Sequence, residues 1–163
     1  MILVLVLILR PVATQAQDPD GSKAQGSLFF APGASTGGGS TTSTVHFGGN
    51  GEALVYKGLG VGAEIGYLAP WSSMSDGIGV FSANGSYNFF PRRGEKKLVP
   101  FVTGGYTLFF RSGSANGFNF GGGVNWWLKP KAGLRLEFRD QVWPGHCCNS
   151  AHFLEFRVGL AIR

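Results

Sequence analysis

The sequence predicts an all-β protein, an eight-stranded antiparallel up-and-down transmembrane β-barrel. Several segments alternate apolar residues with polar, charged or glycine residues, which is the pattern of a strand with two different faces. Charged residues make up only 14% of the chain, against about 25% in an ordinary soluble domain. Glycine (27 residues) and aromatic residues (13%) are both abundant, and a length of 163 residues fits one domain.

The N-terminal segment has the features of an export signal. Ile2 to Leu9 is an unbroken apolar run that is too short to cross a bilayer as a helix. Small residues follow at Thr14 and Ala16, and the next residues are polar, which predicts cleavage after Ala16. We therefore expect a signal peptide at 1–16, a polar lead-in at 17–25 and an outer-membrane β-barrel domain at 26–163.

Turn residues divide the remaining chain into eight segments rich in β-branched and aromatic residues. The expected strands are 26–32, 44–56, 59–69, 78–90, 98–110, 117–128, 132–142 and 152–162. The Gly/Ser/Thr run at 33–43 is expected to be a loop, and the glycines at 48–51 a bulge or bend. Short connections follow the second and sixth strands and irregular ones follow the odd strands. This asymmetry is typical of short periplasmic turns and longer outer loops, with both termini periplasmic.

The two faces of these strands differ in polarity. In the last strand, Leu154, Phe156 and Val158 alternate with Glu155 and Arg157. A membrane barrel directs the apolar face to lipid and the other face into the lumen. Pooled over three strands, the polar face holds three acids and three bases, which are Glu64, Arg135, Glu137, Arg139, Glu155 and Arg157. Because buried charges need partners and an eight-stranded barrel has a filled interior, we predict that these six form an ion-paired plug.

The main alternative is a soluble exported lipocalin-like β-barrel, whose apolar face would line a cavity for a small apolar ligand. Its solvent surface would then be mostly Gly, Asn and Ser with few charges, which is sparse for a soluble protein. Aromatic residues near the strand ends instead predict two interfacial girdles. The expected periplasmic set is Tyr56, Phe89, Phe90, Phe101, Trp126 and Trp127, and the expected outer set is Tyr67, Trp71, Phe109, Phe110, Phe118 and Trp143.

Residues 121–140, Gly-Gly-Gly-Val-Asn-Trp-Trp-Leu-Lys-Pro-Lys-Ala-Gly-Leu-Arg-Leu-Glu-Phe-Arg-Asp, together with the closing strand at 153–163, resemble the OmpA/OmpX-like small outer-membrane β-barrels of Gram-negative bacteria. The resemblance implies an eight-stranded barrel in the cell outer membrane, in contact with outer-membrane lipid and lipopolysaccharide. It also implies that the barrel-assembly machinery acts on the chain during biogenesis, and it implies no enzymatic activity. We expect a monomer.

Few residues suggest chemistry. Cys147 and Cys148 are adjacent in the last outer loop and could form a vicinal disulfide in an oxidising compartment. A zinc site with His146 and His152 would match no common spacing, so we predict no metal and no cofactor. No basic stripe or motif indicates nucleic-acid binding.

A third hypothesis is an outer-membrane lipid-modifying hydrolase that uses Ser150, His152 and Glu155. In one strand, however, His152 and Glu155 point to opposite faces. We therefore expect no catalytic site and no enzyme. The expected function is that of an integral outer-membrane β-barrel protein with a structural, surface-interaction or narrow-pore role.

Overall fold

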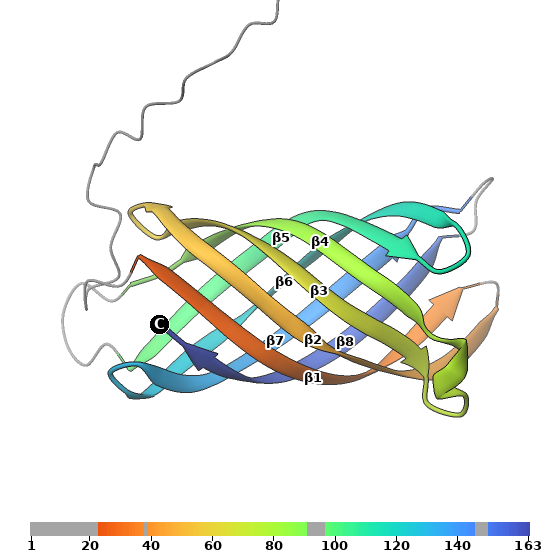
Figure 1. Ribbon diagram of the computed structural model, residues 1–163, viewed down its shortest axis with the longest axis horizontal. Coiled ribbons are helices and arrows are strands. Elements are labelled where there is room, and N and C mark those ends of the chain that lie inside the picture. The colour runs from red at the N-terminus through yellow and green to blue at the C-terminus, as the bar shows by residue number, and fades with distance from the viewer. Residues whose placement is uncertain (1–22, 38, 91–96, 146–149) are drawn as a thin grey trace, which may run out of the picture.

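The computed structural model describes residues 23–37, 39–90, 97–145 and 150–163, which form a closed eight-stranded barrel (Figure 1). Each strand pairs antiparallel with the next, and β8 pairs with β1. The predicted fold class is confirmed. The strands are β1 (Ala24–Gly37), β2 (Ser40–Tyr56), β3 (Leu59–Pro70), β4 (Ile78–Asn88), β5 (Leu98–Phe110), β6 (Ser114–Lys129), β7 (Ala132–Trp143) and β8 (Ala151–Ile162).

The two ends of the barrel differ. At one end, the β2–β3 turn consists of Lys57 and Gly58, both with positive φ, and a similarly short turn joins β6 to β7. The start of β1 and the end of β8 lie at this same end (Figure 1). The opposite end carries the 3₁₀ helix η1 (Met74–Asp76) between β3 and β4. Within the described ranges, no helix has the length and apolar character needed to cross a bilayer.

Two expectations about β1 and β2 are wrong. Residues 33–37 and 40–43 of the run expected to be a loop are strand, because the β1–β2 ladder continues from Gly33↔Thr44 to Gly37↔Ser40. A Cβ at Gly33 would collide with the carbonyl oxygen of Leu154, so this glycine allows close contact with β8. The glycines at 48–51 form no bulge, since their register with both neighbouring strands is unbroken; the irregularity lies between Leu54 and Tyr56.

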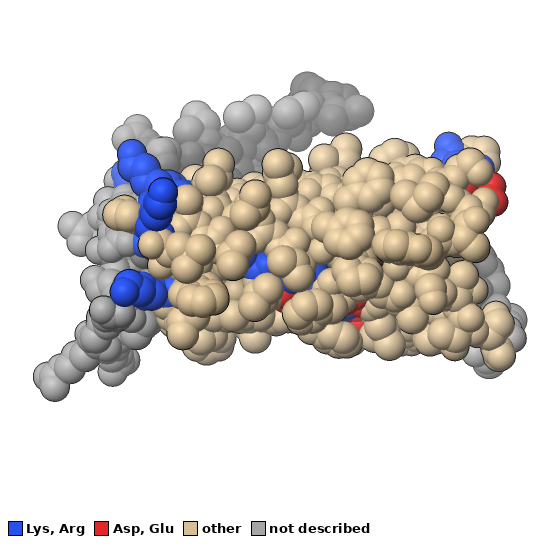
Figure 2. Space-filling model, turned by 90° about the horizontal axis from the view of Figure 1, so that it is seen from below, with Lys and Arg blue, Asp and Glu red and all other residues tan. Residues whose placement is uncertain are grey.

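The outer wall of the barrel is apolar, and the lumen is polar. Leu28, Ile65 and Leu160 are among the most exposed residues, with 72%, 63% and 68% of their surface accessible. The charged residues of the alternate faces are buried. Figure 2 shows this wall as mostly uncharged, with basic side chains gathered at one end. A lipocalin-like arrangement requires the apolar face inside, so the structure contradicts the soluble alternative.

The expected aromatic girdles need one correction. Phe101, Phe109 and Trp127 point into the lumen and are almost fully buried, with 2–3% of their surface accessible. The expected residues that remain exposed on the outside are Tyr56, Phe89 and Trp126 at one end and Trp71, Phe110 and Phe118 at the other. Trp143 is also exposed, but it lies on the inward side of β7, where its ring packs against Phe109 at the mouth of the lumen. Phe109 and Trp127 belong to apolar clusters at the two ends of the lumen, whereas the ring of Phe101 lies against the guanidinium of Arg135. The expected signal peptide lies outside the described residues.

Candidate functional site

The lumen has a polar centre between two apolar clusters. At the end with η1, Leu68, Val80 and Phe109 pack with three partly buried neighbours, Ile78, Ala115 and Phe153. At the end with the short turns, Val99, Trp127 and Ala161 pack with Phe90. The buried residues of both clusters point into the lumen, on the same side of their strands as the buried polar residues. The polar centre is therefore shielded at both ends.

Glu64 on β3 lies at the middle of the polar centre. Its Oε2 atom accepts hydrogen bonds from Arg139 Nη1 at 3.0 Å and from Arg157 Nη1 at 2.7 Å. These arginines come from β7 and β8, on the other side of the barrel from β3. Glu64 and both arginines have 2% of their surface accessible. One carboxylate thus joins strands that share no backbone hydrogen bonds.

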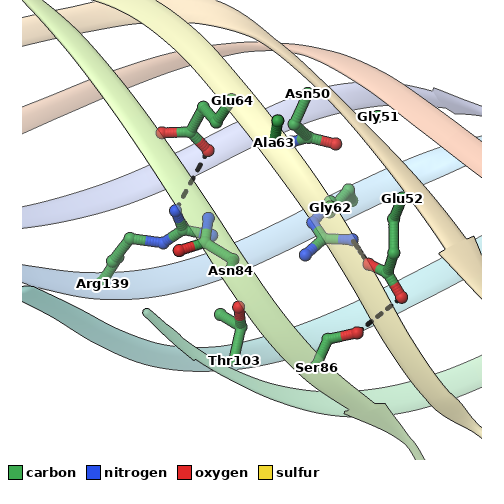
Figure 3. A pocket seen from close by; sticks show the side chains of 11 residues that line it. Asn50, Gly51, Glu52, Gly62, Ala63, Glu64, Asn84, Ser86, Thr103 and Arg139 are labelled. Carbon is green, nitrogen blue, oxygen red and sulfur yellow. Dashed lines mark hydrogen bonds and ion pairs between the residues drawn. The ribbon is translucent and has the colours of Figure 1, made fainter. Parts of the chain in front are cut away.

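The ion pairs continue toward the short turns. Arg139 also pairs with Glu137, and Glu137 Oε2 accepts from Arg135 Nε at 3.0 Å. Arg135 Nη1 lies 4.0 Å from Glu52 on β2. Glu52 Oε1 further accepts from Ser86 Oγ at 2.6 Å and from the Asn88 amide at 2.8 Å. Figure 3 shows Arg139 beside Glu64 and Ser86 beside Glu52, with their side chains pointing into the barrel.

The ion pairs also continue toward η1. Arg157 Nε donates to Glu155 Oε2 at 2.8 Å, and His46 Nδ1 donates to Glu155 Oε1 at 3.0 Å. Gln141 Nε2 donates to the same oxygen at 2.8 Å. His46 and Gln141 have no accessible surface. Acidic and basic side chains therefore alternate along the chain of ion pairs. From the end with the short turns to the end with η1, its members are Glu52, Arg135, Glu137, Arg139, Glu64, Arg157, Glu155 and His46.

The structure brings all six predicted lumen residues into this one chain of ion pairs and adds two more. Glu52 and His46 on β2 were not expected. With them the lumen holds four carboxylates, three guanidinium groups and one imidazole, so His46 occupies the position of a fourth base. The signal for both residues is their even spacing in β2, which places them on the same face as Thr44 and Leu54.

Aromatic rings and hydrogen-bonded side chains fill the remaining space. The guanidinium carbon of Arg135 lies 3.7 Å from the ring centre of Phe101, and that of Arg157 lies 4.4 Å from the ring centre of Phe29. A cavity of about 20 Å³ beside Glu52 and Glu64 has room for about one water molecule (Figure 3). Such a lumen is a packed polar core, which suits a structural role.

The residues of the hydrolase hypothesis are not assembled. Glu155 is inside the barrel, whereas His152 is on the outer wall, where its Nδ1 lies 2.8 Å from Asp140 Oδ2. The expected disulfide of Cys147 and Cys148, and the neighbouring His146, lie outside the described residues. Over the ranges that the structure describes, no three His, Cys, Asp or Glu side chains are grouped to hold a metal ion.

The end with η1 is open and hollowed. One hollow of about 240 Å³ is lined by Ser35, Thr42, Leu68 and Phe153 among others, and a second of about 250 Å³ lies beside Phe109 and Trp143. The η1 loop at this mouth is held by Arg111, which donates to the carbonyl oxygens of Ser75 and Asp76 at 3.1 Å.

A short hydrogen bond orders the same loop. Ser73 Oγ donates to Asp76 Oδ2 at 2.5 Å, and Arg111 Nη2 lies 3.6 Å from Asp76 Oδ1. The hydrogen bond from Ser73, with the nearby charge of Arg111, holds the pKa of the Asp76 carboxyl below its usual value. The loop is therefore a defined surface of the mouth.

Comparison with known proteins shows the fold. No protein-family model and no characterised protein matches the sequence. Among solved structures, Neisserial surface protein A superposes with a TM-score of 0.72 at 12% identity, covering 86% of this chain and 97% of that one. This chain has the fold of the small outer-membrane β-barrels. The outer membrane protein OprG from Pseudomonas aeruginosa is also similar (TM-score 0.54, 12% identity, 89% of this chain and 98% of that one). Ail, the attachment invasion locus protein of Yersinia pestis, is similar as well (TM-score 0.53, 11% identity, 85% of this chain and 97% of that one).

Proposed function

We propose that this protein is an integral barrel of the bacterial outer membrane with a structural and surface-interaction role and a closed lumen. One observation carries the proposal, namely that an apolar wall surrounds a lumen of paired charges. In water, such a wall would expose a large apolar surface, which soluble monomers avoid. In a bilayer, the wall matches the hydrocarbon and every strand is paired in the closed ring, so no strand edge faces lipid.

The charge at the two ends supports an orientation. The described residues at the end with the short turns include six basic side chains and no Asp or Glu, the basic ones being Lys23, Lys57, Lys97, Lys129, Lys131 and Arg163 (Figure 2). We place this basic rim in the periplasmic leaflet, where anionic phospholipid headgroups attract it. Short turns on that side agree with the architecture of outer-membrane barrels, and the η1 end then faces outward.

The packed lumen favours a structural role over a pore. An ion crossing the barrel would have to pass both apolar clusters and break the chain of ion pairs between them. Space for about one water molecule is far from a continuous path. Of the roles considered, the narrow pore is therefore the least supported.

The outer mouth supports a role in surface interaction. Its two hollows and the ordered η1 loop give it a defined shape that a partner could contact. The name of Ail refers to attachment and invasion, which agrees with a contact role for a barrel of this fold. We propose no partner beyond outer-membrane lipid, lipopolysaccharide and the barrel-assembly machinery, and a monomeric state.

Two measurements test the proposal. Tagged protein expressed in a Gram-negative host should be found in the outer-membrane fraction, and unboiled samples should migrate differently from boiled ones on a gel. Recovery in the soluble periplasm without a mobility shift would refute the membrane assignment. In planar bilayers, the folded protein should show no steady conductance, whereas a stable ionic current would refute the closed lumen.

A further inference from the structure

One hollow at the outer mouth of the barrel lies outside the chain of ion pairs. Its volume is about 250 Å³, and it lies between the mouth ends of β4, β5, β6 and β7. Ile78, Phe109, Ala115 and Trp143 line it from the inward sides of these four strands. An apolar cavity of about 150 Å³ holds one benzene molecule, so this hollow has room for one aromatic ring with a substituent.

Aromatic rings form one side of the hollow. The ring centre of Phe109 lies 6.2 Å from that of Trp143 and 5.6 Å from that of Phe153. Phe109 is almost fully buried, whereas Trp143 has 42% of its surface accessible. Aromatic rings attract one another in offset and edge-to-face arrangements, so the accessible part of the Trp143 ring can take a further ring from a ligand.

A cation that is held in place also lines the hollow. Arg111 donates to the carbonyl oxygens of Ser75 and Asp76 at 3.1 Å, which fixes the position of its guanidinium group. Its charge is already balanced, because Nη2 lies 3.6 Å from Asp76 Oδ1, and half of its side chain is accessible. A guanidinium paired in this way attracts an anion only weakly, but it still attracts the face of an aromatic ring.

We propose that this hollow binds a small uncharged aromatic molecule that carries one hydroxyl or N–H group. The ring of the ligand packs on Trp143, with the guanidinium of Arg111 beside its face. The turn at 112–114, which also lines the hollow, offers serine hydroxyls to the polar group of the ligand. An anionic ligand would be repelled by Asp76, whereas a neutral ring is not. The inference deepens the surface-interaction role and rests on the proposed function, which exposes this mouth to the outside of the cell.

The test uses the full barrel in phosphatidylcholine nanodiscs, labelled with ¹³C on the isoleucine δ1-methyl groups and titrated with phenol. Three isoleucines follow the expected signal peptide, namely Ile78 in the hollow and Ile65 and Ile162 on the outer wall. Phenol bound in the hollow should shift the Ile78 methyl signal through its ring current, with half-saturation at about 1–10 mM. Phenol that only dissolves in the lipid should shift the two wall signals in proportion to its concentration, without saturation.

A second ligand and two variants make the test specific. Cyclohexanol has the size and the hydroxyl group of phenol without the aromatic face, so it should compete with phenol at least about threefold more weakly than phenol itself binds. Trp143→Leu should lower the affinity for phenol about threefold to tenfold, because it removes a ring contact. Trp71→Leu is the matched control, since the exposed Trp71 ring contacts Phe30 on the outer wall and its loss should leave the affinity unchanged.

Several outcomes would overturn the inference. They are the lack of a saturable shift at Ile78, equal binding of cyclohexanol and phenol, and equal affinity for phenol in the Trp143→Leu and Trp71→Leu variants. If Trp143→Leu does not fold, the comparison of phenol with cyclohexanol on the wild-type barrel decides. Heat-modifiable mobility is checked first. A wild-type barrel that does not enter bilayers refutes the proposed function, whereas one that enters bilayers and shows no saturable shift refutes only this inference.

Discussion

Arg157 donates to Glu64 at 2.7 Å across the lumen and so connects β8 to β3, two strands that share no backbone hydrogen bonds. The same guanidinium pairs with Glu155, and the same carboxylate oxygen accepts from Arg139. Each charge inside the barrel therefore has an opposite charge beside it. This arrangement offsets the cost of placing charges in an interior that excludes water.

Removing Arg157 should destabilise the barrel strongly. Arg157→Met leaves Glu64 and Glu155 each with one cation fewer, and breaking a buried pair in this way costs about 3–5 kcal/mol. Urea unfolding in lipid vesicles measures the change in the free energy of unfolding. Arg111→Gln, which breaks an exposed pair with Asp76, is the control and should have a much smaller effect. Equal effects of the two variants would contradict a buried network.

Neutralising Glu64 as well should restore part of this loss. The Glu64→Gln/Arg157→Met double variant has no carboxylate at position 64 that could lose the Arg157 cation. The losses of unfolding free energy in the two single variants should therefore not be additive. A double-mutant cycle on unfolding free energies gives the coupling. Simple additivity would mean that the 2.7 Å contact contributes nothing of its own.

A charge on the outer wall should be penalised according to its depth. Leu136→Arg, near the middle of β7, should lower the free energy of unfolding by about 2–4 kcal/mol, whereas Leu128→Arg, next to the β6–β7 turn, should cost about 0–1 kcal/mol. Both leucines are on the apolar side of their strands, so the comparison isolates depth. The same small cost at both positions would show that the wall does not face hydrocarbon.

Glycines that face the lumen should tolerate an added methyl group less well than glycines on the outer wall. A Cβ at Gly123 would meet the backbone of Leu136 and Glu137, so Gly123→Ala should cost about 1–3 kcal/mol. At Gly85 the nearest atom is 3.9 Å away, and Gly85→Ala should change stability little. The same vesicle unfolding assay distinguishes the two. A loss at Gly85 as large as that at Gly123 would contradict the assigned faces.

The basic rim should respond to lipid charge. Replacing Lys57, Lys129 and Lys131 by Gln should weaken folding into phosphatidylglycerol vesicles more than into phosphatidylcholine vesicles, and added salt should reduce the difference. Folding yields in the two lipids measure the effect. An equal loss in both lipids would indicate that these lysines stabilise the barrel itself and do not contact anionic headgroups.

Strand positions and faces could be predicted where alternation is simple, as in β3, β7 and β8. On β2 the glycines at 48, 49 and 51 occupy both faces, which hides the parity that places His46 and Glu52 inside. On β5 both faces are apolar near the strand ends, so the sequence could not show that Phe101 and Phe109 point into the lumen. The pairing of His152 with Asp140 depends on the β7–β8 register, and no local pattern encodes that register.

The central claim is that the apolar face contacts lipid and the alternate face does not, and Trp126 and Trp127 test it most directly. These neighbours on β6 point to opposite sides, with 43% and 3% of their surface accessible. In two single-tryptophan variants, one keeping Trp126 and one keeping Trp127, fluorescence is measured in vesicles of brominated lipid. The account predicts strong quenching of Trp126 and little quenching of Trp127. Equal quenching of both, or stronger quenching of Trp127, would contradict it.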